Sequence, residues 1–305
     1  MKIYVVGSGG LGGYLGALLA RAGEDVTFVA RGDHYRVMKE RGLRVKSVAG
    51  DFEIKPVQVI DRISGISSPD LIFFAVKTYD TDRAAKELSA VVGEKTMVVS
   101  IQNGVDNDRE IRRHVTNGEV YPGLAYVAVE RTEAGLVEQT GGPRKFIFGD
   151  RNDPLNGRLK ELEKLMKKAG IDAVASDDIT RDLWKKFMFI VAFSGMTAIC
   201  RSPIGRILGE PITRGLHERC LKEAIQVAQS LKIRIEDRAF ENILATTHGF
   251  HPDSKSSLLV DIENKRRTEI ETLSGKVAQL AGENQIDVPI NELIYGAVKL
   301  GTSVQ

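Results

Sequence analysis

The chain has 305 residues, of which 42% are hydrophobic and 28% are charged, a composition typical of a globular protein. The 43 Lys and Arg residues nearly balance the 41 Asp and Glu residues and leave a net charge of +2. A general nucleic-acid binder needs a surplus of cations to neutralise phosphates, so this balance argues against that class. The length exceeds what one hydrophobic core usually fills, and we therefore expect two domains.

Cysteine content and the distribution of apolar residues indicate the compartment. Cys200 and Cys220 are too few for a disulfide framework and are not spaced as metal ligands, so we expect a reducing cytoplasm. The densest apolar run, Phe187–Phe193, is far shorter than the roughly 20 residues that cross a bilayer, and we expect no membrane segment. Residues 1–6 lead straight into a glycine turn, which indicates a first β-strand rather than a secretory leader.

Short apolar segments alternate with helical patterns in the first half of the chain. In chain order we predict strands at 3–6, 25–30, 71–76 and 97–101, and helices at 11–22, 33–42 and 80–91. Segment 71–76 is apolar at every position, which is typical of a strand buried on both faces. This alternation predicts βαβ units and a mostly parallel sheet.

The pattern changes after residue 121. Segments 125–130, 136–139 and 145–148 are short and strand-like, with Gly135 and the pair Gly141 and Gly142 as turns, and we expect them to add strands at the edge of the sheet. A helix at 155–169 and a strand at 171–175 follow. The α/β domain is therefore predicted to cover residues 1–175.

Strand signals nearly vanish after Ser176. We predict helices at 178–200, 210–231, 236–245, 253–283 and 289–300. The fourth is predicted as one long helix because its apolar residues recur at helical spacing, namely Leu259, Ile262, Ile270, Leu273, Val277 and Leu280. Residues 176–305 are thus expected to form an all-helical domain.

A glycine-rich turn follows the first predicted strand. The segment 7–12 (GSGGLG) matches the pattern G-x-G-x-x-G between a strand and a helix. Gly7 allows a tight turn, Gly9 lets the backbone approach a pyrophosphate, and Gly12 lets helix and strand pack closely. The helix N-terminus then presents free N–H groups to the phosphates. The context predicts a Rossmann-type domain whose cofactor contacts are Gly7, Ser8, Gly9, Gly10, Leu11 and Gly12.

The end of the second strand indicates which dinucleotide is bound. NAD-binding domains usually place Asp or Glu there to bond the ribose 2′-hydroxyl, whereas this chain has Ala30 followed by Arg31. A cation without the acid suits a 2′-phosphate, so we predict NADP(H); the alternative is a solvated surface arginine. Lys77 follows the strand at 71–76 and is either a further cofactor ligand or a solvated loop lysine.

A histidine pair and a lysine pair are further candidates for catalytic groups. His248 and His251 do not have the spacing of a helical zinc site, so we place them in a loop and predict no metal. Lys185 and Lys186 begin a strongly apolar helix. A lysine there can donate a proton to a carbonyl oxygen as hydride arrives, or it can be a surface lysine whose stem packs on apolar groups.

Together these motifs resemble those of the ketopantoate reductase family, the 2-dehydropantoate 2-reductases, over nearly the whole length. The similarity is carried by the glycine motif, Arg31, and the segments 76–78 (VKT), 102–104 (QNG), 183–187 (LWKKF), 256–261 (SSLLVD) and 267–271 (RTEIE). The resemblance implies a cytoplasmic enzyme of pantothenate biosynthesis. Its substrate would be a small 2-oxo acid, 2-dehydropantoate, which it would reduce to pantoate with NADPH.

The resemblance also implies roles for single residues. Lys186 would be the catalytic lysine that protonates the keto oxygen during hydride transfer. Glu269 would hydrogen-bond the substrate hydroxyl and help to orient the lysine. Ser257 would contact the substrate carboxylate, and Asn103 would contact both cofactor and substrate.

The chain departs from the family pattern at three positions. The family carries asparagines four and eight residues after the lysine and again soon after that helix, where this chain has Ile190, Ser194 and Ile204. Losing hydrogen-bonding groups relaxes or redirects the choice of a hydroxylated substrate. A different, more apolar 2-oxo acid or a related carbonyl compound is therefore an alternative substrate. A non-enzymatic NADP-binding redox sensor is a third possibility, although it needs neither Lys186 nor Glu269. The helical domain allows a homodimer without requiring one.

Overall fold

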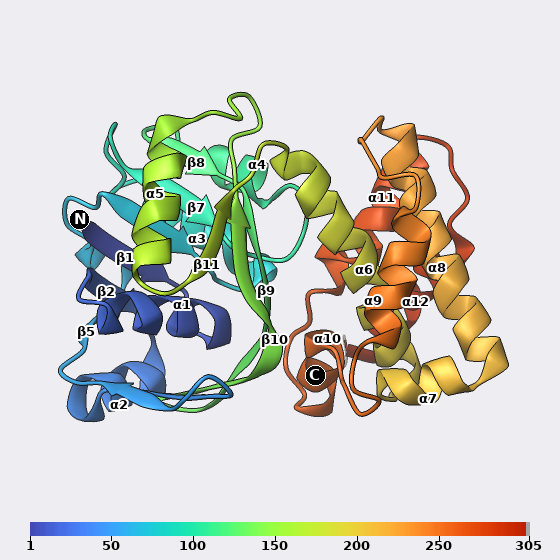
Figure 1. Cartoon of the computed structure of the whole chain (residues 1–305), viewed down its shortest axis with the longest axis horizontal. Helices are drawn as coiled ribbons and strands as arrows, with labels where there is room; N and C mark the ends of the chain where they lie inside the picture. The colour runs from blue at the N-terminus through green and yellow to red at the C-terminus, as the bar shows by residue number, and fades with distance from the viewer. Residues whose placement is uncertain (303–305) are drawn as a thin grey trace. The chain divides into compact units, whose positions relative to one another are not determined.

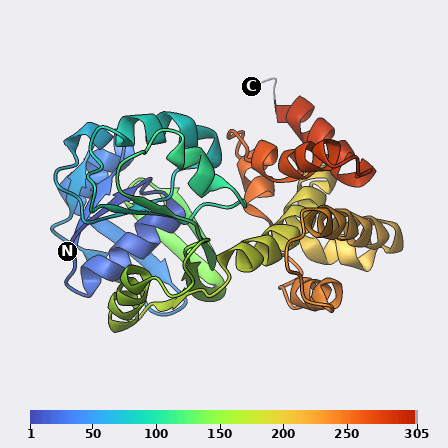
Figure 2. The same ribbon diagram turned by 90° about the horizontal axis from the view of Figure 1, so that it is seen from above.

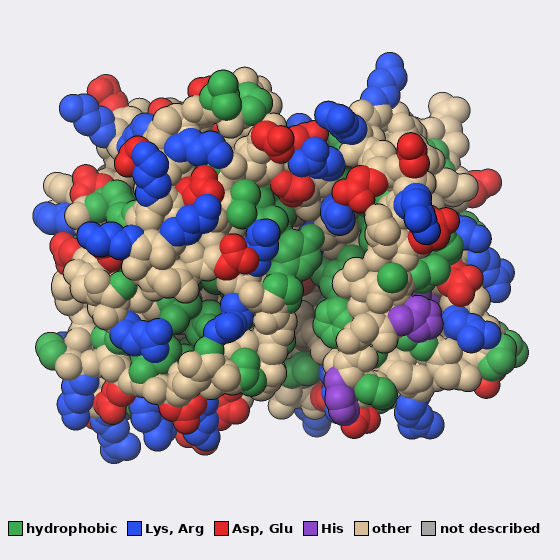
Figure 3. Space-filling view, viewed as in Figure 1, with side chains coloured by type: hydrophobic (Ala, Val, Ile, Leu, Met, Phe, Trp, Pro, Cys, Tyr) green, Lys and Arg blue, Asp and Glu red, His purple; other side chains and the backbone are tan. Residues whose placement is uncertain are grey.

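The computed structural model describes residues 1–302. The chain divides into two compact units, the first spanning Met1–Ile179 and the second beginning at Thr180. In Figure 1 the first unit runs from blue to yellow-green and the second from there to red. Figure 3 shows side chains of both charge signs interspersed over one face of the molecule. The first unit is an α/β unit and the second is helical, as the sequence predicted.

The first unit is built on a parallel sheet of six strands. They lie in the order β5-β2-β1-β6-β7-β8, and every neighbouring pair is parallel. Their bounds are β1 (Lys2–Val6), β2 (Asp25–Val29), β5 (Gln58–Ile60), β6 (Leu71–Phe74), β7 (Met97–Ser100) and β8 (Glu119–Tyr121). The predicted parallel sheet is confirmed, and β5 and β8 are strands that the sequence patterns did not reveal.

Helices cover both faces of this sheet (Figure 2). They are α1 (Gly10–Arg21), α2 (Gly32–Arg41), α3 (Thr81–Leu88) and α4 (Asn107–Arg112), with short 3-10 turns at η1 (Ile63–Gly65) and η2 (Thr78–Asp80). Because side chains alternate along a strand, β1 sends Val5 into the core shared with α1 and Val6 into the core shared with α3 and α4. Burial on both faces explains why the central strands are continuously apolar.

A second sheet lies beyond α1. Its members are β3 (Leu43–Ser47), β4 (Phe52–Ile54), β9 (Gly123–Glu133), β10 (Leu136–Phe148) and β11 (Asp172–Ala175), with α5 (Gly157–Lys168) before the last strand. Strand β10 pairs antiparallel with β9 and parallel with both β3 and β11. The prediction that residues 125–148 extend the first sheet is therefore wrong. Their partners outside this segment are β11, which was predicted as a strand, and β3, which was not; β4 pairs with β3.

Seven α-helices lie within residues 179–302 and form the second unit, apart from Ile179, the first residue of α6. They are α6 (Ile179–Cys200), α7 (Ile204–Gly209), α8 (Pro211–Ser230), α9 (Ala239–His248), α10 (Ser257–Glu263), α11 (Ser274–Glu283) and α12 (Pro289–Thr302). His248 is the last residue of α9 rather than part of a loop. Helix α6 is long and apolar enough to cross a membrane, but 72% of its most apolar window is buried inside the protein, as in a core helix.

The single helix predicted at 253–283 is wrong. Helix α10 ends at Glu263, and Lys265 has φ +54°, a left-handed conformation that stops a helix. A connection with buried Thr268 and Glu269 and the short turn η3 (Ile270–Thr272) then lead into α11. The apolar spacing was detected correctly, since Leu259 and Val277 are both buried. It is shared between two helices, and the break brings an acidic residue into the interior.

Candidate functional site

Four loops meet at one edge of the parallel sheet. They follow β1 at Gly7, β2 at Ala30, β6 at Ala75 and β7 at Ile101. After β2 and β5 on one side of β1, the chain crosses to β6 on the other side, so the strand order reverses between β1 and β6. Ligands of open parallel sheets bind outside the carboxyl ends of the strands at such a reversal. The predicted cofactor residues of this unit lie on these loops and, for Gly10, Leu11 and Gly12, in the first turn of α1.

The glycine turn has the geometry that a dinucleotide requires. Gly7 has φ +96°, and a Cβ there would lie 2.5 Å from the backbone nitrogen of Val76. A Cβ on Gly12 would lie 2.3 Å from the carbonyl oxygen of Gly7. At Gly9, by contrast, a Cβ would meet no described atom within 4 Å. No side chain caps the N-terminus of α1 and its first turn holds no acid, so its N–H groups suit a pyrophosphate.

A buried histidine holds this turn in place. His34 donates from Nε2 to the carbonyl oxygen of Ser8 at 2.7 Å and accepts from the Gly135 N–H at Nδ1, 2.9 Å away. This pair of bonds requires a neutral ring, and burial lowers the pKa of His34 accordingly. The Ser8 hydroxyl and the Ser8 backbone N–H both donate to the carbonyl oxygen of Val29, which ties the turn to the end of β2. No local sequence pattern indicates His34, because its partners lie 26 and 101 residues away along the chain.

The loops after β2, β6 and β7 carry the other predicted cofactor residues. Arg31 precedes α2, its side chain is 48% exposed, and its guanidinium lies 3.6 Å from the Glu87 carboxylate of α3. Lys77 directly precedes η2, and the carbonyl oxygen of Asn103 accepts a hydrogen bond from Asn107. The fold therefore places the Glu87 carboxylate beside Arg31, although the residues directly before and after Arg31 are not acidic.

Gln102 joins two of these loops. Its side-chain amide donates to the carbonyl oxygen of Val76 and to the hydroxyl of Thr81, both at 2.8 Å. Its carbonyl oxygen accepts from the hydroxyl of Ser100. Since Gln102 is buried, these bonds fix the loop that carries Lys77 relative to the loop that carries Asn103.

The two neighbouring lysines of α6 have different environments. Lys186 is 8% exposed, as is Glu269, whereas the Lys185 side chain is 45% exposed and forms an ion pair with Glu236 at 2.9 Å. Burial lowers the pKa of Lys186 to about 8, and the nearby negative charge of Glu269 opposes part of that decrease. A buried lysine beside a buried acid, with a pKa close to neutrality, suits general acid chemistry.

The remaining predicted substrate residues also belong to the second unit. Ser194 and Ile204 are buried and Ile190 is partly buried. Ser257 is the exposed first residue of α10. Its neighbour Ser256 has the structural role, because its hydroxyl caps α10 and accepts a hydrogen bond from Thr197 of α6 at 2.7 Å. Ser257 is therefore available to a ligand while Ser256 holds α10 against α6.

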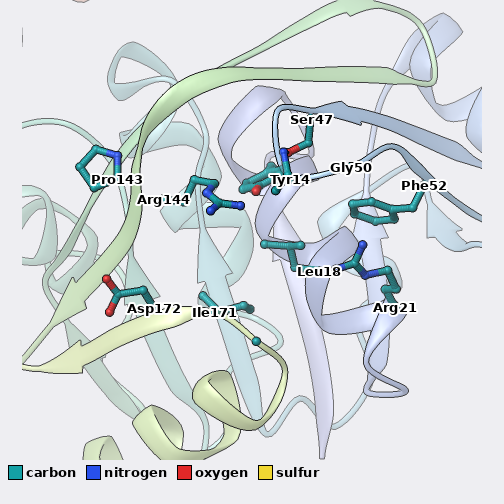
Figure 4. A pocket seen from close by; sticks show the side chains of 12 residues that line it. Tyr14, Leu18, Arg21, Ser47, Gly50, Phe52, Pro143, Arg144, Ile171 and Asp172 are labelled. Carbon is teal, nitrogen blue, oxygen red and sulfur yellow. The ribbon is translucent and has the colours of Figure 1, made fainter. Parts of the chain in front are cut away.

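A separate pocket of about 120 Å³ lies in the first unit (Figure 4). It is formed by α1, the turn between β3 and β4, β10 and the loop before β11. Arg144 points toward Tyr14 in this view, and the Arg21 guanidinium lies 4.2 Å from the centre of the Phe52 ring. None of the described lining residues belongs to the glycine motif. We therefore assign this pocket no part in cofactor binding.

Comparison with known proteins identifies relatives over both units. A family model described as ketopantoate reductase PanE/ApbA matches residues 3–153, and its C-terminal counterpart matches residues 178–301. The chain is 29% identical to a 2-dehydropantoate 2-reductase of Pyrococcus horikoshii over 304 residues, which cover 100% of this chain and 98% of that protein. Among solved structures, a PanE/ApbA family ketopantoate reductase from Ralstonia eutropha has a TM-score of 0.93 and 27% identity, covering 100% of this chain and 99% of that one.

A further structural relative shares the fold at lower identity. It is a D-mandelate dehydrogenase solved with NADH and anilino(oxo)acetate, with a TM-score of 0.91 and 20% identity. The match covers 100% of this chain and 99% of that one. The fold of this chain thus also occurs in a protein named as a D-mandelate dehydrogenase.

Proposed function

This chain belongs to the ketopantoate reductase family, and we propose that it reduces 2-dehydropantoate to pantoate with NADPH, as a step of pantothenate biosynthesis in the cytoplasm. Family membership makes it an oxidoreductase that acts on a CH–OH group. The observation that carries the finer proposal is the buried Lys186 with Glu269 beside it. Such a lysine is costly to bury and is of use where a carbonyl oxygen gains charge.

The first unit would hold the cofactor. Backbone N–H groups of the glycine turn would bind the pyrophosphate, and Arg31 would pair with the 2′-phosphate. Lys77 and Asn103 would contribute from the loops after β6 and β7, whose backbone Gln102 holds. The bound reduced nicotinamide supplies hydride to C2 of the substrate and is itself oxidised.

The second unit would supply the proton. As C2 gains hydride, negative charge develops on the keto oxygen, and the Lys186 ammonium stabilises this charge and donates a proton to form the alcohol. The lysine pKa of about 8 keeps most of this group protonated at neutral pH while making it a better acid than a solvated lysine. Glu269 would accept a hydrogen bond from the substrate hydroxyl, and Ser257 would bond the carboxylate.

Replacing Glu269 by alanine tests its two roles. We expect Glu269→Ala to raise the KM for 2-dehydropantoate and to lower kcat to a smaller degree. The Glu269 charge raises the pKa of Lys186, so its loss should move the alkaline decline of kcat to lower pH. The pH dependence of kcat and KM between pH 6 and 10 measures both effects. An unchanged pH profile with an unchanged KM would remove Glu269 from the proposed site.

Replacing Arg31 by alanine tests the choice of cofactor. A hydrogen bond to a charged group contributes about 1.5–3 kcal/mol, so NADPH binding should weaken about 10- to 150-fold while NADH binding changes little. Fluorescence titration with each cofactor measures the two dissociation constants. Arg36→Ala is the matched control, because Arg36 lies on α2, the helix that Arg31 precedes, is exposed and pairs with Asp33. Equal weakening of both cofactors by Arg31→Ala would exclude a 2′-phosphate contact.

A further inference from the structure

An aromatic cluster shares one face of α6 with Lys186. Positions 189, 190, 193 and 197 follow Lys186 at intervals of 3, 4, 7 and 11 residues, which place them on the same side of an α-helix. The side chains there are Phe189, Ile190, Phe193 and Thr197. The face that begins with the proposed acid therefore continues as an apolar, largely aromatic surface and ends at a hydroxyl.

Three residues of the stretch 250–269 interact with this face at successive positions. Glu269 influences Lys186 by charge, and Ser256 accepts the hydrogen bond from Thr197. Between these two contacts, the Phe250 ring stacks on Phe189 with 5.5 Å between ring centres and lies 5.1 Å from Phe193. The aromatic cluster, defined as Phe189, Phe193 and Phe250, thus lies between the proposed proton donor and the helix that begins with Ser257.

The loop that carries Phe250 has a defined position. Ile204 and Gly205 at the start of α7 donate backbone hydrogen bonds to Ser254 and Pro252 at 3.0 and 2.8 Å. Phe250 nevertheless remains 37% exposed, which is unusual for a large aromatic side chain engaged in two ring contacts. Its open part is apolar surface next to the face of α6 that carries Lys186.

The same surface has fewer of the hydrogen-bonding side chains that would recognise a hydroxylated substrate. Ile190 lies one turn after Lys186, and Ile204 is buried where Gly205 meets the Phe250 loop. Neither side chain can donate or accept a hydrogen bond, whereas the family pattern has amides at both positions. One helical turn is about 5.4 Å, so Ile190 lies within the length of an aromatic 2-oxo acid whose keto oxygen is bound at Lys186.

From this juxtaposition we propose a second substrate class for the reductase: 2-oxo acids that carry an aromatic side chain, with that side chain against Phe189, Phe193 and Phe250. The inference rests on the proposed function, because the keto oxygen is taken to lie at Lys186. The chemistry is the same in both cases, with hydride added to C2 and a proton to the oxygen, so only the side-chain subsite differs.

The test compares kcat/KM for phenylpyruvate and for 2-dehydropantoate, each with NADPH as the reductant. We expect phenylpyruvate to be reduced at least as efficiently as 2-dehydropantoate. If 2-dehydropantoate is reduced and the kcat/KM for phenylpyruvate is about 100-fold lower, the second substrate class is overturned and the proposed function stands. Reduction of neither compound, by protein shown to bind NADPH, would overturn the proposed function and this inference with it.

Two substitutions identify the subsite. The specificity ratio is the kcat/KM for phenylpyruvate divided by the kcat/KM for 2-dehydropantoate. Phe250→Ser should lower this ratio about tenfold, because it removes the exposed ring. Ile190→Asn should lower the same ratio by improving 2-dehydropantoate, because it restores an amide. Phe240→Ser is the matched control, since Phe240 is a partly exposed phenylalanine of the same unit that contacts Lys222 instead. If Phe250→Ser and Phe240→Ser leave the ratio equally unchanged, the aromatic cluster is not the subsite.

Discussion

Replacing Lys186 by alanine is expected to lower kcat about 10²–10⁴-fold, the range of general acid catalysis, while NADPH binding stays near normal. The ammonium interacts most strongly with the charge on the keto oxygen in the transition state, so its loss acts on turnover more than on binding. Burial strengthens this interaction, because the low surrounding dielectric screens it less than water does. Steady-state kinetics and a separate NADPH titration measure the two quantities.

Lys185 is the matched control for this prediction. Its side chain is half-exposed and pairs with Glu236, and surface ion pairs of this kind contribute about 0–1 kcal/mol. Lys185→Ala should therefore lose much less activity than Lys186→Ala. An inactive Lys185→Ala beside a near-normal Lys186→Ala would mean that the assignment is displaced by one residue. The chemistry would then lie about 100° around α6, and Ile190 would leave the substrate subsite with it.

The lowered pKa of Lys186 adds a pH dependence of known sign. Since burial brings this pKa to about 8, kcat should fall as the pH rises above 8 and the acid loses its proton. The unfolded chain binds this proton more tightly than the folded chain does. The buried ammonium therefore lowers the free energy of unfolding at neutral pH. This penalty becomes smaller as the pH rises from 8 to the ordinary lysine pKa. The wild type should therefore gain stability relative to Lys186→Met as the pH rises from 7 to 10, and Lys186→Met should also lose turnover. A difference in unfolding temperature that does not change with pH would show that Lys186 is not buried as an ammonium.

Replacing Gly9 by alanine is expected to weaken NADPH binding about 10- to 100-fold without lowering the unfolding temperature. A Cβ at Gly9 meets no described protein atom within 4 Å, and its φ of −72° is ordinary for alanine. The methyl group would instead occupy the space that the pyrophosphate needs, and overpacking of this kind costs about 1–3 kcal/mol. Calorimetric titration and thermal unfolding of the same preparation separate the two effects.

Gly12→Ala is the contrasting variant. Its Cβ would lie 2.3 Å from the Gly7 carbonyl oxygen and 2.9 Å from Val5, so the strand and helix would have to separate. This variant should lose thermal stability as well as cofactor affinity. A Gly9→Ala protein that binds NADPH like the wild type would show that the pyrophosphate does not lie against Gly9.

Features that depend on neighbours along the chain could be predicted from the amino-acid sequence alone. A continuously apolar strand, a glycine turn and a helix follow one another within residues 2–21, and each is specified by side chains only a few positions apart. The same holds for the parallel sheet and for the helical character of the second unit. Arg31 became a candidate from its place after the second strand, whereas Lys186 was distinguished from Lys185 only by the resemblance to the family.

The tertiary structure decided what depends on distant partners. Strand β3 exists because Arg44 pairs with Leu136, and no local pattern contains that partner. The helix predicted at 253–283 ends at Glu263, and the connection that follows buries Thr268 and Glu269 against the rest of the unit, which the continuous apolar spacing did not indicate. Two adjacent lysines look alike in sequence, and only packing places Lys185 outside and Lys186 inside beside Glu269. Burial and long-range pairing create the acid of the proposed reaction, because both are properties of surroundings that a local stretch of sequence does not include.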